Sequence, residues 1–256
     1  MADRAYGKFF LVTMIKLSFF LILCEAANYF SLRLVPAPFN KLIPPLAAAV
    51  ITWFFLTVIE RNSCSFFAKG YFLQNVIIGG LWGFGAAVAG PLVALAFNVR
   101  QFNWFADCDI TKIMLDSAAS GLFLAIVVFG YFYHILISDF GAIPAIIISS
   151  LIFGLLSAVE VLSGVVAHDI LLPAAAYYAI IGTAAGMLIL GMGDMRSAAA
   201  FLFAHQVMSQ VCEAFTTGGK NFETDLGAPI MAVLCAFSMF LEIRREKKEK
   251  KEFLNY

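Results

Sequence analysis

The sequence predicts an all-α, polytopic membrane protein, a bundle of about eight transmembrane helices, on the basis of three observations. Hydrophobic residues make up 62% of the 256 residues and charged residues 13%. Soluble domains have about 45–50% apolar and about 25% charged residues. The mean hydropathy is +0.89. Apolar stretches of about 20 residues, the length that crosses a bilayer core about 30 Å thick, recur along the chain.

The first half of the chain contains four of these stretches, which are Phe9–Phe30, Leu42–Ile59, Tyr71–Phe97 and Ile113–Ile137. The first is too long for the core of a signal peptide, so we expect it to remain as a helix. Prolines at positions 36, 38, 44 and 45 separate the first two stretches. Proline interrupts helices, so these residues predict a connecting loop.

The second half contains four more stretches, which are Ile143–Val166, Ile170–Leu190, Ser197–Phe215 and Ala228–Leu241. Only five residues, 138–142, separate the fourth and fifth stretches of the chain, which predicts a tight antiparallel hairpin. No linker is long enough to divide the chain. We therefore expect one transmembrane domain over residues 1–243 and a charged tail over residues 244–256.

The loop charges predict the orientation of the bundle. If the N-terminus is cytoplasmic, eleven Lys and Arg residues fall on the inside and five on the outside. Cytoplasmic loops carry the excess of such residues, so both termini are expected in the cytoplasm, which requires an even number of spans. Six of the eleven lie in the tail, between Arg244 and Lys251.

Small residues spaced four apart mark helix faces that can approach closely. Gly79 and Gly83 form such a pair in the third stretch, and Gly182 and Gly186 form another in the sixth. These glycines predict either packing within the bundle or an interface with another membrane protein.

The composition and motifs exclude several function classes. Seventeen basic and seventeen acidic residues give no net charge, so nucleic acid is not expected as a partner. The five cysteines form no C-x-x-C pair and the three histidines form no H-E-x-x-H motif, so we expect no metal site and no cofactor. No nucleophile elbow or phosphate-binding loop is present.

Ionisable residues at membrane depth are functional candidates, because a charge there is costly. Glu160 lies deep in the fifth stretch and His205 lies in the middle of the seventh, both among apolar residues. Glu213 is on the same helical face as His205. A buried histidine can also serve a structural role through hydrogen bonds.

From Leu124 to Ser209 the chain resembles the CAAX protease and bacteriocin-processing (CPBP or Abi) family of intramembrane proteins. The resemblance rests on three apolar blocks in the family's order, which are residues 128–136, residues 140–156, and residues 182–186 with 200–205. It implies a CPBP-like helical bundle and a bacterial plasma membrane.

The catalytic positions of the family are mostly replaced in this chain. The resemblance places the paired glutamates at Leu124 and Ala125, the arginine at Phe129 and the first histidine at Ser157. Leucine and alanine cannot accept a proton as a general base. Only the last histidine is retained, as His205.

The remaining candidates for catalysis are His205, Ser157, Ser209, which replaces the family's asparagine, and Glu160, one turn beyond Ser157. The first hypothesis is therefore a non-catalytic relative, a scaffold or accessory subunit that binds a membrane or secreted partner within the lipid bilayer. The second is a divergent intramembrane hydrolase that uses these residues. The third is a transporter or channel subunit in which Glu160, His205 and Glu213 line a polar path.

Overall fold

The computed structural model describes residues 2–37, 39–61, 71–97, 101–103, 108–162, 171–216 and 227–253. Side chains are described between residues 11 and 245 of these ranges, except at 32 and 160–162. The described part is a helical bundle, and its only β contact is an isolated bridge between Phe102 and Thr216. The all-α prediction is confirmed.

The helices follow the predicted stretches closely. Their bounds are α1 (Ala2–Leu34), η1 (Phe39–Lys41), α2 (Ile43–Phe54), η2 (Phe55–Ile59), α3 (Phe72–Ala96), α4 (Ile110–Ser117), η4 (Ala118–Leu122), η5 (Ala125–Phe132), α5 (Tyr133–Phe140), α6 (Ala142–Leu162), α7 (Leu171–Met192), α8 (Met195–Phe215) and α9 (Gly227–Phe253). The segments from α4 to α5 form one long crossing, and η2, η4 and η5 are π-helical.

Local chemistry explains where several helices begin and end. Pro44 and Pro45 were expected in the loop between the first two stretches, but they occupy the first turn of α2, where no intrahelical N–H is needed. Asp109 caps α4 by accepting a hydrogen bond from the Lys112 N–H at 3.0 Å. Gly141 and Gly193 have positive φ angles of 86° and 65°, which only glycine adopts readily, and they end α5 and α7. The predicted hairpin at residues 138–142 is confirmed by this break at Gly141.

Seven segments of the described chain are long and apolar enough to cross a membrane. They do not include α8, the seventh predicted stretch. It is a 21-residue helix, but polar residues such as Arg196 and Gln206 interrupt its apolar sequence. This helix packs most extensively against α3, so it lies inside the bundle rather than among lipid-facing helices.

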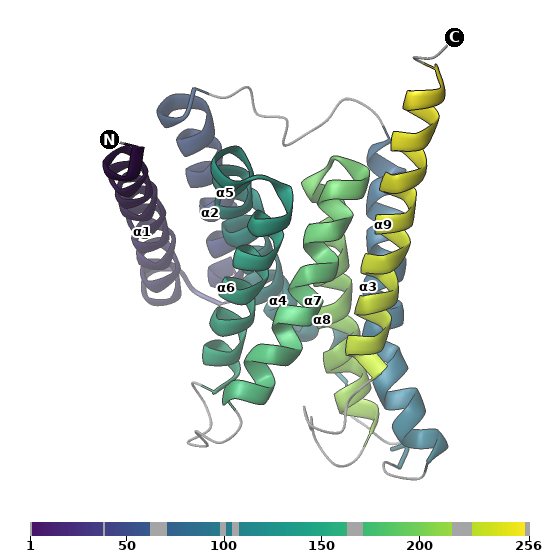
Figure 1. Ribbon diagram of the computed structural model, residues 1–256. Coiled ribbons are helices and arrows are strands. Elements are labelled where there is room, and N and C mark those ends of the chain that lie inside the picture. The colour runs from purple at the N-terminus through teal and green to yellow at the C-terminus, as the bar shows by residue number, and fades with distance from the viewer. Residues whose placement is uncertain are drawn as a thin grey trace.

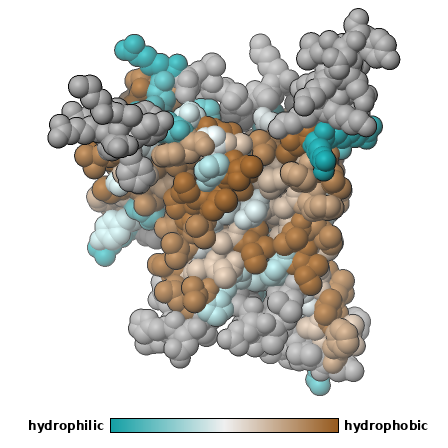
Figure 2. Space-filling view, in the orientation of Figure 1, coloured by the Kyte–Doolittle hydropathy of each residue, from teal (hydrophilic) through white to brown (hydrophobic). Residues whose placement is uncertain are grey.

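The surface carries an apolar belt. Large hydrophobic side chains on several helices are more than half exposed, for example Leu46 at 64%, Leu81 at 65% and Ile143 at 70%. Figure 2 shows hydrophobic residues across the middle of one face, with the most hydrophilic described residues towards its upper edge. Such a surface needs lipid around it. The chain is a membrane protein.

The direction of the helices sets the two ends of the bundle. Figure 1 shows that α1 begins and α9 finishes at the same end. The connections at Gly141 and at Gly193 with Asp194 are too short for parallel neighbours, so α5 and α6, and also α7 and α8, are antiparallel. We call the end where α1 begins the terminal end. The last helix continues to Phe253, so most of the predicted tail extends α9.

Candidate functional site

A cavity of about 790 Å³ lies among helices from both halves of the chain. This volume is within the range of pockets that enclose small ligands, about 300–1,000 Å³. Its lining residues are Glu25, Asn28, Lys41, Asp116, Ala119, Ser120, Gly121, Phe123, Leu124, Phe153, Leu156, Ser157, Val159, Tyr178, Ile181, Leu202, His205, Gln206 and Gln210.

The cavity lies in the half of the bundle away from the terminal end. Its residues come from the later parts of α1, α6 and α8, which run away from that end. They also come from the early parts of the α4–α5 crossing and of α7, which run back towards it. Helices of opposite direction thus contribute opposite parts of their length, which places the lining at one level of the bundle.

The lining is charged and accessible on one side of the cavity and mostly apolar and buried on the other. Glu25 is exposed, and Lys41 and Asp116, which form an ion pair, have side chains that are 29% and 34% exposed. The opposite part of the lining is almost inaccessible, with Ser157 6% and His205 2% exposed. The cavity therefore has a charged rim and a floor of apolar residues with a few polar groups.

A π-helical segment faces this cavity. Residues 118–122 form η4, and three of them, Ala119, Ser120 and Gly121, are part of the lining. Ser120 donates a hydrogen bond to the Asp116 carbonyl oxygen at 3.1 Å. Single π-helical turns are rare in proteins, but those that occur are often at functional sites. They change the direction of the side chains within a helix.

The structure brings together three of the positions to which the resemblance assigns catalytic residues. Leu124, Ser157 and His205 lie in three different parts of the chain, the α4–α5 crossing, α6 and α8, and all line the cavity. Ser209 is buried on α8, one turn beyond His205, but is not part of the lining. The side chain of Glu160 lies outside the described residues.

The other two assigned positions belong to the core. Ala125 is fully buried and Phe129 is 2% exposed. The Phe129 ring packs against Phe153, with 5.7 Å between the ring centroids. An arginine at position 129 would place its charge among apolar side chains.

His205 lies beside aromatic rings. Its ring is 6.4 Å from that of Phe201, in a stacked orientation, and 6.3 Å from that of Tyr177. Glu213, predicted on the same helical face, is half-buried and does not line the cavity. A polar path from His205 through Glu213 is thus not formed by this cavity.

The four glycines predicted at packing faces lie against other helices of this chain. A Cβ atom at Gly79 or Gly83 would collide with the carbonyl oxygen of Ser197 or Phe201 on α8. At Gly182 it would lie 3.1 Å from the Phe153 ring, and at Gly186 3.1 Å from Ile146. These glycines therefore pack helices of the bundle against one another. The alternative of an interface with another membrane protein stays a prediction.

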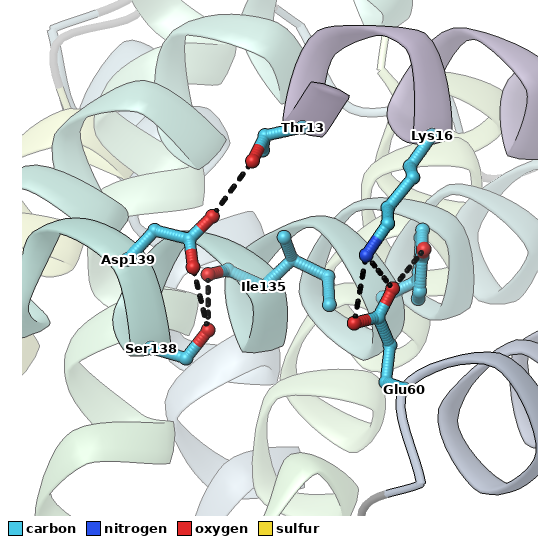
Figure 3. A network of polar contacts seen from close by, with 7 residues as sticks. Thr13, Lys16, Glu60, Ile135, Ser138 and Asp139 are labelled. Carbon is cyan, nitrogen blue, oxygen red and sulfur yellow. Dashed lines mark hydrogen bonds and ion pairs between the residues drawn. The ribbon is translucent and has the colours of Figure 1, made fainter. Parts of the chain in front are cut away.

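A network of polar side chains lies towards the terminal end, near the ends of η2 and α5. Figure 3 shows it from close by. Lys16 Nζ lies 2.9 Å from Glu60 Oε1, and the Tyr131 hydroxyl donates to the same oxygen at 3.4 Å. Thr13 donates to Asp139 Oδ2 at 2.9 Å, which joins α1 to α5. Lys16 lies inside the first predicted stretch, Phe9–Phe30. Its partner Glu60 directly follows the second predicted stretch, and this position was the one feature of the sequence that could have suggested the pair.

Aromatic side chains pack beside this network. The Phe20 ring lies 5.3 Å from Phe55 and 4.2 Å from Tyr131, and the Phe55 and Tyr131 rings are 5.3 Å apart. Phe20 is fully buried and Phe55 is 2% exposed. Helices α1, η2 and η5 are therefore in direct contact at this end.

Sequence reasoning missed most of the polar lining. Asn28, Lys41, Asp116, Gln206 and Gln210 carry no motif, and only the fold brings them to one cavity. Among the side chains that the structure describes, no three of His, Cys, Asp and Glu gather in a way that could hold a metal ion. Comparison with protein-family models, with curated proteins and with solved structures finds no match to this chain.

Proposed function

We propose that the chain is a non-catalytic, CPBP-like integral membrane protein, a scaffold or accessory subunit that holds a segment of a membrane or secreted partner in the cavity. The observation that carries this proposal is the lining at Leu124, Ser157 and His205. The three positions share one cavity, but a leucine and a serine stand where the resemblance requires an acid and a histidine. The cavity is therefore present, but the group expected to act as general base is replaced by a leucine that cannot accept a proton.

The polar groups of the lining suit a peptide. Every peptide N–H and C=O that leaves water needs a hydrogen-bond partner. Asn28, Gln206 and Gln210 each offer an amide that both donates and accepts, and Ser120 offers a hydroxyl. The apolar floor offers room for a hydrophobic side chain.

The proposed location is a bacterial plasma membrane with both termini in the cytoplasm. The excess of Lys and Arg on one side of the membrane supports this orientation. In that orientation the cavity lies in the outer half of the membrane, since it is away from the terminal end. A secreted protein, or the outer segment of a membrane protein, reaches the cavity from that side.

A divergent hydrolase is the second candidate, because Ser157 and His205 share the cavity. The carboxylates of the described lining are Glu25 and Asp116 at the rim, and Asp116 is bound by Lys41. If the purified protein has peptidase activity and His205→Ala abolishes it, the hydrolase is right and the scaffold proposal is wrong. A transporter has less support, since Glu213 does not line the cavity that contains His205.

Affinity purification in a mild detergent, with mass spectrometry of the captured proteins, tests the scaffold. Ser157→Trp and Gln206→Trp each fill part of the cavity and are expected to abolish capture of the partner. Leu151→Trp is the matched control, because Leu151 is on the same helix as Ser157 but is 54% exposed on the lipid-facing surface. Capture that survives both cavity variants contradicts the proposal.

A further inference from the structure

Glu25 is the one carboxylate of the described lining that has no ion-pair partner among the described residues. The lining contains two carboxylates and one ammonium group. Lys41 neutralises Asp116 through a direct ion pair, which leaves the charge of Glu25 uncompensated. Apart from His205, the described lining carries one net negative charge, which lies at its rim.

This charge stands above an apolar and aromatic floor. Phe123, Phe153 and Tyr178 line the cavity and are each 5% exposed or less. Aromatic faces attract cations, and an exposed carboxylate attracts them further, although by a modest amount. An anionic group brought to the same rim would face Glu25 without a free cation among the described lining residues.

We propose that the segment bound in this cavity carries one basic side chain, a lysine or an arginine, that pairs with Glu25 at the rim while neighbouring apolar residues occupy the floor. This inference rests on the proposed function, since it takes a peptide segment as the occupant. It goes beyond the proposed function by specifying that the bound segment carries a positive charge. A lysine stem is long and apolar, so it can lie along the wall while its ammonium group stays at the rim.

Three capped peptides that differ at one central position test the inference. They share one apolar sequence and carry lysine, glutamine or glutamate at that position, and their binding to the full chain in lipid nanodiscs is measured by calorimetry. The lysine peptide is expected to bind about two- to fivefold more tightly than the glutamine peptide, the range of a partly exposed ion pair. The glutamate peptide is expected to bind most weakly.

Charge variants at the rim identify the group responsible. Glu25→Gln is expected to remove the difference between the lysine and glutamine peptides, and Glu25→Lys to favour the glutamate peptide. Lys41→Gln frees Asp116 and is expected to increase the preference for lysine. Glu242→Gln is the matched control, because Glu242 is exposed on α9 and does not line the cavity.

The outcomes separate this inference from the proposed function. If the three peptides bind equally and Ser157→Trp abolishes all binding, the basic residue is wrong and the peptide-binding cavity stands. Unchanged selectivity in Glu25→Gln also overturns the inference. If no peptide binds and the partner survives the cavity variants in the affinity purification, both proposals fail.

Discussion

Lys16 in α1 and Glu60 at the end of η2 form an ion pair, with 2.9 Å between Nζ and Oε1. The two residues are 44 positions apart, and their side chains are 36% and 15% exposed. The pair joins α1 to the neighbouring helix at the terminal end of the bundle (Figure 3). It explains how a lysine is accommodated inside a predicted span, where an unpaired charge is costly.

Replacement of Lys16 by methionine is expected to lower the free energy of unfolding by about 1–2 kcal/mol. The partly buried Glu60 carboxylate then loses the Lys16 ammonium group, while the Tyr131 hydroxyl stays within hydrogen-bond distance. Unfolding by SDS titration in mixed micelles, followed by circular dichroism, measures this loss. Lys112→Met is the control, because Lys112 is exposed. Strictly additive effects of Lys16→Met and Glu60→Gln would contradict a coupled pair.

Two glycines of α3 are expected to respond oppositely to alanine. At Gly83 the added Cβ collides with the Phe201 carbonyl oxygen, so Gly83→Ala is expected to lower the free energy of unfolding by about 1–3 kcal/mol. At Gly80 no atom lies within 4 Å of the added Cβ. Gly80→Ala is therefore expected to be neutral or to stabilise the helix by up to about 1 kcal/mol. Thermal unfolding of both variants in detergent checks this, and equal melting temperatures would contradict the packing of α3 on α8.

Asp194 is expected to be the more important of the two aspartates that begin helices. It is 1% exposed, accepts from the Arg196 N–H at 2.9 Å and from Asn75 Nδ2 at 3.0 Å, and pairs with the Arg196 guanidinium. Asp194→Ala is expected to cost about 3–5 kcal/mol, because it removes the carboxylate of a largely buried ion pair and the acceptor of the buried Asn75 amide. Asp109→Ala removes an exposed cap and is expected to cost about 0.5–2 kcal/mol. Chemical unfolding of both variants compares them, and equal losses would argue against the buried network.

Labelling of cysteines tests the proposed orientation. Cys108 is half-exposed just before α4, at the end of the bundle opposite the terminal end. A membrane-impermeant maleimide is expected to label it in intact cells, in a chain in which Cys64 and Cys212 are replaced by serine. Cys24 and Cys235 are fully buried and are expected to remain unlabelled. Labelling of Cys108 only after the membrane is permeabilised would reverse the orientation.

The composition and the hydrophobic pattern were sufficient to predict the helices of this chain. Apolar runs of about 20 residues can form little other than membrane helices, since the backbone must satisfy its own hydrogen bonds in lipid. The extent of α9 was underestimated, because the prediction followed hydropathy and ended at Leu241, whereas the helix continues through the charged residues to Phe253. Charged residues form helix readily once they are outside the hydrocarbon region.

The candidate site was predictable only in part. His205 and Ser157 could be singled out, because each is a polar residue at an assigned position in an apolar stretch. Gln206 and Gln210 could not, since an amide on a helix gives no sign of whether it faces lipid, a neighbouring helix or a cavity. The role of Gly83 was left open for the same reason, because small residues allow close approach without specifying the partner.

The sequence alone determined that this protein is a membrane-embedded helical bundle, because hydrophobicity and length are properties of each segment by itself. Only the tertiary structure decided that Leu124, Ser157 and His205 share a cavity with Glu25 at its rim, and that Lys16 pairs with Glu60. Those relationships depend on the direction, rotation and packing of several helices at once. The role of a charged residue inside a span is therefore known only once the side chain that pairs with it, from a distant part of the chain, is known.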